Sequence, residues 1–234
     1  MKKILAILLF VLSLFCGDAT AKTLSYVPGN PTRALIIIHG YGQNGHSLRW
    51  MTDNLKKSMP DMAFYYPTAP DRAPVGGYQW FVIPNIGEQI KEKALYDVMM
   101  EGAMKNVQTL HDLVDEIHEK LNLPYENIYV AGFSQGGLMA LLTALTNPHK
   151  IPAAVSFSGV PLLFTPDFTQ NSVKNYPDIL VIQGTKDVVI PKDSLQMTTE
   201  TLTEIGIEPT VRVIEGMAHQ IDREALKAAI EFIK

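Results

Sequence analysis

Residues 128–137 constrain the fold of this chain more than any other stretch. They read Ile-Tyr-Val-Ala-Gly-Phe-Ser-Gln-Gly-Gly, so a strand-like apolar run passes through Gly-x-Ser-x-Gly into a helix-like run, 135–145. Gly132 and Gly136 make room for a very tight turn, because side chains there would clash with neighbouring backbone. Ser134 is therefore expected in a strained conformation, with its hydroxyl projecting above the sheet.

This strand–turn–helix arrangement is typical of the nucleophile elbow of the α/β-hydrolases, and it makes Ser134 the predicted nucleophile. A Gly-x-Ser-x-Gly also arises by chance, but the apolar runs on both sides of this one argue against an accident. The helix that begins beside Ser134 directs backbone N–H groups and the positive end of its dipole toward the serine.

Continuous apolar runs of strand length alternate with helix-like segments along the rest of the chain. This alternation predicts an α/β fold, with a mostly parallel central sheet and helices on both faces. No period of 20–50 residues repeats, so residues 22–234 are expected to form a single domain. The other expected strands are 34–38, 63–66, 153–157, 179–182 and 210–214, and the other expected helices are 48–59, 98–121, 194–205 and 224–233.

Residues 1–21 are expected to be a cleaved signal peptide. A charged start precedes the apolar run 4–15, and residues 19–21, Ala-Thr-Ala, form a small-x-small cleavage site. The run is shorter than the 20 or so residues that a membrane-spanning helix needs. Cleavage after Ala21 implies a bacterial periplasmic or secreted enzyme with no membrane span in its mature chain. Cys16 offers an alternative, lipidation as the new first residue, although Phe15 is bulky for such a site.

The composition is that of a globular protein, with 47% hydrophobic and 19% charged residues. The net charge is −4 and no basic run exceeds Lys56-Lys57, so nucleic acid is not an expected partner. His111 and His118 share the predicted helix 98–121, where we expect them on the solvated face. Two histidines alone do not make a metal site, and neither a metal nor another cofactor is expected.

A serine hydroxyl needs a base to take its proton, and only His149 and His219 follow Ser134 in the chain. His219 lies in the loop after the last predicted strand, where an α/β-hydrolase carries its base, whereas His149 follows the elbow helix. Asp187 lies after a buried strand between Ser134 and His219, which gives the chain order Ser, Asp, His. Asp222 is the other nearby carboxylate, and it is expected to cap the final helix.

Attack on a carbonyl group creates an oxyanion, which backbone N–H groups stabilise. In this fold one donor is the residue after the nucleophile, here Gln135, and the other follows the first strand of the domain, here Tyr41. His39 precedes Tyr41 in the glycine-rich loop 39–45, and we interpret it as a residue that shapes the loop rather than as a second base.

Residues 68–90 show no clear period and contain several prolines, Gly76-Gly77 and a dense aromatic group. A long irregular stretch in a compact domain is often functional. Two interpretations of Tyr78, Trp80 and Phe81 stay open: the rings pin the loop to the body of the domain, or they line a substrate groove.

Several segments together resemble the phospholipase/carboxylesterase family, which includes acyl-protein thioesterases. They are 39–42 (His-Gly-Tyr-Gly), 80–81 (Trp-Phe), 132–137 (Gly-Phe-Ser-Gln-Gly-Gly), 184–191 (Gly-Thr-Lys-Asp-Val-Val-Ile-Pro) and 215–219 (Glu-Gly-Met-Ala-His). Residues 132–137 are the most specific part, and the resemblance covers roughly residues 33–234. It implies an α/β-hydrolase fold without a separate cap domain and an apolar groove over the nucleophile.

The resemblance also implies roles for individual residues. Ser134, Asp187 and His219 would form the catalytic triad, and Tyr41 and Gln135 the oxyanion hole. The side chains expected near the acyl site are Trp80, Phe81, Val189 and Met217.

Two positions near the acyl site depart from the family pattern. The family usually has Gly-Asp or Gly-Leu-Gly-Asp after the first strand, where this chain has Tyr41 and Gln43, and it commonly has a proline at the position of Val188. Because both positions border the acyl site, these departures concern the substrate preference and leave the triad unchanged.

The main expectation is a serine carboxylesterase that cleaves small-molecule or lipid acyl esters through an acyl-enzyme. One alternative is a lysophospholipase or acyl-protein thioesterase, which a long apolar groove would favour. Another is an inactive hydrolase fold that serves as a binding module. The intact set of Ser134, Asp187 and His219 argues against that reading. A homodimer is a further expectation, because exposed apolar loop residues could support one.

Overall fold

The computed structural model describes residues 23–84, 92–190 and 193–234. The predicted signal peptide, 1–21, and Cys16 within it lie outside the described residues. In the part that is described, no helix is both long and apolar enough to cross a membrane.

Seven strands form the central sheet, in the order β1-β3-β2-β6-β7-β8-β9. Every neighbouring pair is parallel except β1 and β3, so the prediction of a mostly parallel sheet is confirmed. The strands are β1 (Leu24–Tyr26), β2 (Arg33–Ile38), β3 (Met62–Tyr66), β6 (Ile128–Phe133), β7 (Ala153–Phe157), β8 (Asp178–Gly184) and β9 (Thr210–Ile214).

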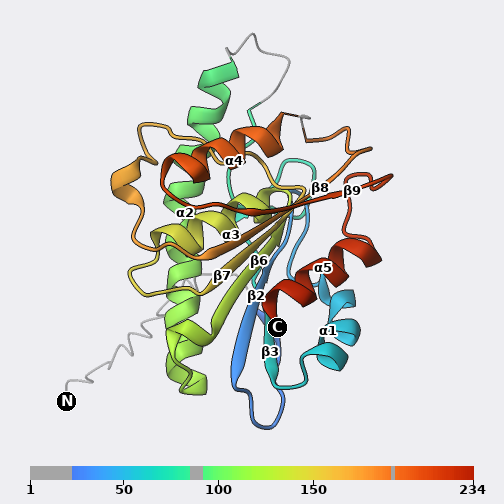
Figure 1. Ribbon diagram of the computed structural model, residues 1–234. Coiled ribbons are helices and arrows are strands. Elements are labelled where there is room, and N and C mark those ends of the chain that lie inside the picture. The colour runs from blue at the N-terminus through green and yellow to red at the C-terminus, as the bar shows by residue number, and fades with distance from the viewer. Residues whose placement is uncertain (1–22, 85–91, 191–192) are drawn as a thin grey trace, which may run out of the picture.

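Helices cover both faces of this sheet (Figure 1). Helices α1 (Thr52–Ser58) and α5 (Arg223–Ile233) cover one face, and α2 (Glu92–Leu121), α3 (Gln135–Thr146) and α4 (Ser194–Glu204) cover the other. Short 3-10 turns occupy Arg49–Met51, Tyr125–Asn127 and Gln170–Ser172.

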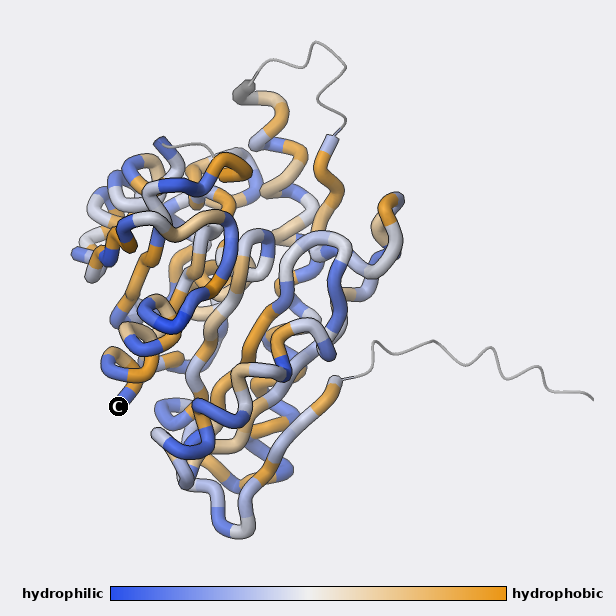
Figure 2. Tube along the Cα trace, turned by 90° about the vertical axis from the view of Figure 1, so that its right-hand side faces the viewer, coloured by the Kyte–Doolittle hydropathy of each residue, from blue (hydrophilic) through white to orange (hydrophobic). Residues whose placement is uncertain are grey.

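Strand β2 shows why the apolar runs become central strands. Leu35 and Ile37 face the core beneath α1 and α5, while Ile36 and Ile38 face the core beneath α2 and α3. Because successive side chains point to opposite faces, a strand covered on both sides must be apolar at every position. The hydrophobic residues accordingly concentrate along the central strands, and many turns are hydrophilic (Figure 2).

Helix α2 confirms the predicted helix 98–121 but begins earlier than expected, at Glu92 rather than Val98. Its apolar residues recur at helical spacing, and those from Met100 to Ile117 are buried in the core. The expectation of a solvated face is wrong for His111, which is buried, with Nε2 3.3 Å from Thr146 Oγ1 of α3. A histidine can lie on the buried side of α2 because the Thr146 hydroxyl provides a hydrogen-bond partner for its ring nitrogen.

The stretch predicted to be irregular, 68–90, contains a two-stranded sheet of β4 (Asp71–Arg72) and β5 (Tyr78–Gln79). Strands of two residues leave no periodic signal, which is why the sequence did not reveal them. This two-stranded sheet is separate from the central sheet, and the described residues form no cap domain. Residues 85–91 of the stretch lie outside the described part.

Candidate active site

Ser134 occupies the tight turn between β6 and α3, as the sequence predicts. Its φ of 55° and ψ of −117° are strained for a residue with a side chain. A Cβ at Gly132 would overlap the carbonyl oxygen of Gly136, and a Cβ at Gly136 would overlap that of Ile38. The two glycines therefore allow α3 to start directly against β2 and β6, which fixes Ser134 at the carboxyl end of the sheet.

Asp187 and His219 meet at the same end of the sheet, from the loops after β8 and β9. His219 Nδ1 lies 2.8 Å from Asp187 Oδ2. Asp187 Oδ1 accepts hydrogen bonds from the backbone N–H of Val189 at 2.9 Å and of Ile190 at 3.0 Å. All the carboxylate oxygens are thus satisfied, which suits a side chain that is fully buried.

The hydrogen bonds to Asp187 keep its carboxyl group ionised. Burial alone would raise the pKa of Asp187, but the bonds from His219, Ile190 and Val189 together bring that pKa below its ordinary value. An ionised carboxylate can only accept, so the proton between the two side chains sits on His219 Nδ1. The Nε2 lone pair of His219 is then free to act as a base.

One cavity of about 530 Å³ brings Ser134, His219, Tyr41 and Val189 together. Most of its remaining wall is apolar and comes from four segments of the chain: Ile83, Leu95, Met99, Val160, Pro161 and Ile190. A wider groove of about 640 Å³ lies between α1 and α5, but none of the predicted site residues lines it. The smaller cavity is therefore the candidate active site, because it holds the predicted nucleophile and base.

Of the two residues predicted to donate to the oxyanion, Tyr41 lines this cavity and Gln135 directly follows Ser134. Gln135 is the first residue of α3, so its N–H has no carbonyl group within the helix to bond. No acceptor within the described residues is hydrogen-bonded to the N–H of Tyr41, which lines the cavity. Neither N–H group has a hydrogen-bond partner among the residues that the structure describes, which is a condition that an oxyanion donor must meet.

His39 has a structural environment rather than a catalytic one. Its Nδ1 donates to the Gly40 carbonyl oxygen at 2.7 Å, and its Nε2 accepts from the Ala69 N–H at 3.0 Å. Desolvation lowers the pKa of His39 to about 4, so the ring is neutral and both of its nitrogens are occupied. Asp222 likewise has the predicted capping role, because its side chain accepts from the Ala225 N–H at 2.8 Å.

Three of the four side chains predicted near the acyl site do not line the cavity. Trp80, Phe81 and Met217 are 0%, 1% and 1% exposed. Trp80 and Phe81 pack into the core against α2, which favours the interpretation that these rings pin the loop to the body. Val189 lines the cavity and is 61% exposed. A motif shared with a family gives a residue's position in the chain but not the direction of its side chain.

The sequence analysis missed most of the apolar wall. Phe133, Val160 and Pro161 lie at or just after the carboxyl ends of β6 and β7, a position that could have been inferred from the predicted strands. Leu95 and Met99 are four residues apart, so they extend the apolar spacing of α2 toward its N-terminus. Ile83 and Ile190 lie in loops whose sequence carries no comparable signal.

Comparison with known proteins decides the family. The sequence model of the family described as Phospholipase/Carboxylesterase matches residues 27–234. The chain belongs to this family. The prediction from the sequence that the protein is a carboxylic ester hydrolase is thereby confirmed.

Similar individual proteins agree with this family assignment for the chain. It is 31% identical over 223 residues to acyl-protein thioesterase 1 of Candida albicans, covering 89% of this chain and 95% of that protein. It is 27% identical over 223 residues to acyl-protein thioesterase 1 of Eremothecium gossypii, covering 93% and 94%. The crystal structure of esterase PE8 matches with a TM-score of 0.79 at 26% identity, covering 92% and 97%. The predicted α/β-hydrolase fold is confirmed.

Proposed function

We propose that this protein is a serine hydrolase that cleaves carboxylic acyl esters through Ser134, His219 and Asp187. The observation that carries the proposal is a single apolar cavity holding Ser134 and His219, with His219 Nδ1 bonded to the buried, ionised Asp187. Nucleophile, base and orienting carboxylate come from three loops that are far apart in the sequence, so their meeting supports a catalytic role.

In the first half of the reaction His219 Nε2 takes the proton of the Ser134 hydroxyl while Oγ attacks the ester carbonyl carbon. The carbonyl oxygen becomes an oxyanion, which accepts hydrogen bonds from the N–H groups of Tyr41 and Gln135. Collapse of this intermediate breaks the bond to the leaving alkoxide, which takes the proton from His219. The acyl group remains on Ser134.

In the second half water replaces the alcohol. His219 takes a proton from the water as its oxygen attacks the acyl carbon, and the same two N–H groups stabilise the second oxyanion. The intermediate releases the carboxylic acid, and the proton returns from His219 to Ser134 Oγ. Asp187 stabilises the imidazolium in both halves without taking its proton.

The cavity wall favours an acyl chain over a polar group. Burying each methylene group of a chain there would contribute about 0.8 kcal/mol to binding. A lysophospholipase or acyl-protein thioesterase is the second candidate, since the same wall suits a lipid chain and the relatives named above are acyl-protein thioesterases. A binding module without activity is a weaker candidate, because the arrangement of proton carriers and free N–H donors has no evident use in binding alone.

The deciding experiment measures hydrolysis of p-nitrophenyl esters and acyl thioesters of increasing chain length, with the Ser134→Ala variant alongside. A maximum among short- or medium-chain esters that is lost in the variant supports the carboxylesterase. A maximum with long chains or thioesters moves the assignment to lipid deacylation. A folded protein that turns over no substrate overturns the proposal in favour of the binding module.

We also propose that the chain is exported and that residues 1–21 are removed. The proposal rests on the charged start, the apolar run and the Ala-Thr-Ala site. Mass spectrometry of the protein from fractionated bacterial cells tests it, since a mature chain that starts at Lys22 supports cleavage and an intact Met1 contradicts it. A lipidated Cys16 would establish the alternative.

The homodimer stays a prediction, which analytical ultracentrifugation would test.

A further inference from the structure

The side chain of Gln135 makes two hydrogen bonds that the reaction itself does not require. Its Oε1 accepts from the Trp80 N–H at 3.1 Å, and its Nε2 donates to the Phe81 carbonyl oxygen at 2.8 Å. The side chain is fully buried, so both ends of the amide are fixed. The residue that contributes a backbone donor at the cavity thus also holds a segment far away in the sequence.

The segment held by Gln135, residues 78–81, is bonded in turn to the loop that carries Tyr41. The Trp80 indole Nε1 donates to the His39 carbonyl oxygen at 2.9 Å. The Tyr78 carbonyl oxygen accepts from the Gly42 N–H at 2.9 Å, and the Tyr78 N–H donates to the Gln43 carbonyl oxygen at 2.9 Å. These bonds hold the loop before Tyr41 and after it, so residues 78–81 fix where the Tyr41 N–H lies.

The opposite side of the same segment is anchored to α2. Asn106 Nδ2 donates to the Trp80 carbonyl oxygen at 2.7 Å and to Asp71 Oδ2 at 3.1 Å. Trp80 is 0% exposed, and its ring lies 5.4 Å from that of His39. Every polar atom of Trp80 is therefore bonded, and the segment has little freedom to shift.

We infer that the Gln135 side chain is a positioning residue that sets the Tyr41 N–H relative to the Gln135 N–H. The inference rests on the proposed function, in which these two groups bind the oxyanion. A pair of donors stabilises the transition state only when both are in place beforehand. The hydrogen bonds described above connect the two donors. They run from the Gln135 side chain to residues 78–81, and from there to the loop 39–43 that carries Tyr41.

The test uses Gln135→Met, which keeps the backbone N–H and the length of the side chain. It removes both hydrogen bonds of the side-chain amide, to Trp80 and to Phe81. We expect kcat to fall by about 10- to 100-fold, because a displaced catalytic group has effects of that size. KM should change less than threefold, since the acyl wall is untouched. The affinity for an alkyl boronic acid, whose tetrahedral adduct carries an oxygen into the oxyanion site, should fall in parallel with kcat.

A variant at Trp80 keeps the inference testable if Gln135→Met is unstable. Trp80→Phe removes the indole donor to His39 together with part of the buried ring, and it should lower kcat and boronic acid affinity about tenfold. In the double variant of Gln135→Met and Trp80→Phe, the fall in kcat should be smaller than the product of the two single falls. The reason is that both substitutions act through residues 78–81. Thr143→Val is the matched control: Thr143 is a buried α3 residue whose hydroxyl donates to the Met139 carbonyl oxygen of the same helix, and kcat should not change.

The outcomes separate this inference from the proposed function. If the wild type is active, Ser134→Ala is inactive, and Gln135→Met and Trp80→Phe both keep kcat and boronic acid affinity within threefold, the positioning role is wrong and the function stands. A rise in KM with kcat unchanged would also overturn it, because that pattern belongs to substrate binding. An inactive wild type refutes the proposed function itself.

Discussion

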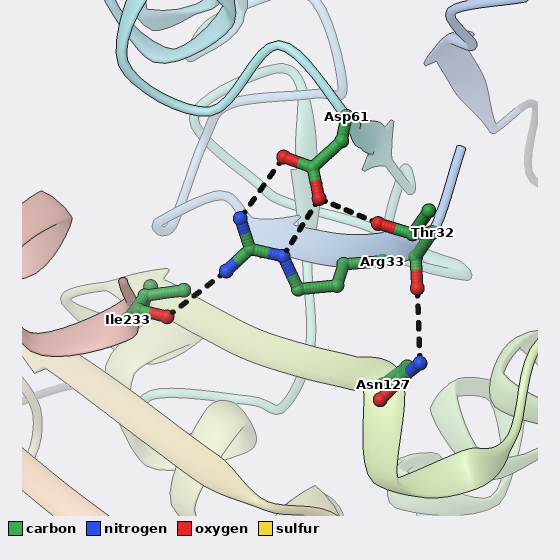
Figure 3. A network of polar contacts seen from close by, with 5 residues as sticks. All are labelled: Thr32, Arg33, Asp61, Asn127 and Ile233. Atoms are coloured by element: carbon green, nitrogen blue, oxygen red, sulfur yellow. Dashed lines mark hydrogen bonds and ion pairs between the residues drawn. The ribbon is translucent and has the colours of Figure 1, made fainter. Parts of the chain in front are cut away.

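The two ends of the parallel sheet use their polar residues in opposite ways. At the carboxyl end, Ser134 and His219 line a cavity, Asp187 lies buried behind His219, and the backbone of Ser134 is strained. At the amino end, Arg33 forms a two-pronged ion pair with Asp61, through Nε at 3.1 Å and Nη2 at 3.0 Å (Figure 3). Polar side chains at the carboxyl end border an open cavity, whereas those at the amino end are bonded to one another.

The amino-end network joins elements that are distant in the sequence. Thr32 donates to Asp61, Asn127 donates to the Thr32 carbonyl oxygen at 3.0 Å, and Arg33 Nη1 lies 3.4 Å from the Ile233 carbonyl oxygen (Figure 3). These residues stand at the starts of β2, β3 and β6 and at the end of α5. Under the proposed function the carboxyl end serves reactivity, whereas the contacts at the amino end serve stability, so substitutions at the two ends should affect different measurements.

The largest expected effect is at Ser134. Ser134→Ala should lower kcat by up to about 10⁶-fold, because the hydroxyl forms the covalent intermediate. The free energy of unfolding should stay within about 0.5 kcal/mol, since the strained backbone is present in both proteins. Ester hydrolysis and urea denaturation measure the two quantities. Ser134→Gly is the control for strain: it should be equally inactive but more stable, and equal stability would show that the turn holds little strain.

Asp187→Asn comes next in size. The amide keeps the shape of the side chain but can present a donor to His219, which would favour the wrong tautomer, and kcat should fall by about 10⁴-fold. Steady-state kinetics at pH 7 provides the measurement. Asp193→Asn is a suitable control, because Asp193 precedes α4 in the same region and its side chain makes no capping bond to that helix. A loss below tenfold in Asp187→Asn would remove Asp187 from the triad.

How far the sequence predicts this molecule depends on whether a feature is local. The elbow, the central strands and the spacing of α2 follow from neighbouring residues, and all are present. The cavity wall is different, because Leu95, Val160 and Ile190 become neighbours only after the chain has folded. Trp80 and Phe81 illustrate the same limit. The sequence marks them as part of a dense aromatic group, but their partners Gln135 and Asn106 come close only in the folded chain.

A smaller effect is expected where the wall limits the acyl chain. Leu95→Trp fills part of the cavity from a partly exposed position on α2, so it should shorten the preferred chain by two or three methylene groups. At about 0.8 kcal/mol each, kcat/KM for long esters should fall about 10- to 100-fold, with acetate esters changed less than threefold. Val98→Trp, on the same helix but outside the cavity, is the control. An equal fall for acetate would place Leu95 in contact with the reacting group instead.

The smallest effect belongs to the amino end and should leave the reaction unchanged. Hydrogen bonds from Arg33 and Thr32 lower the pKa of Asp61 to about 2, whereas an unfolded aspartate titrates near 3.9. A lowered folded pKa contributes stability at neutral pH, and this contribution is lost as pH falls from about 4 through about 2. Because the Asp61 side chain is 38% exposed, solvent screening limits the contribution to about 1 kcal/mol.

Asp61→Asn should therefore lower the free energy of unfolding by about 1 kcal/mol at pH 7, with kcat unchanged. The difference from the wild type should shrink toward pH 3, since protonation begins to remove the same interaction there. Urea denaturation at several pH values measures this difference. Asp178→Asn is the control, because Asp178 also starts a strand but is exposed. A difference that persists unchanged at low pH would mean that the ion pair does not stabilise this end, and a fall in kcat would mean that the two ends are coupled.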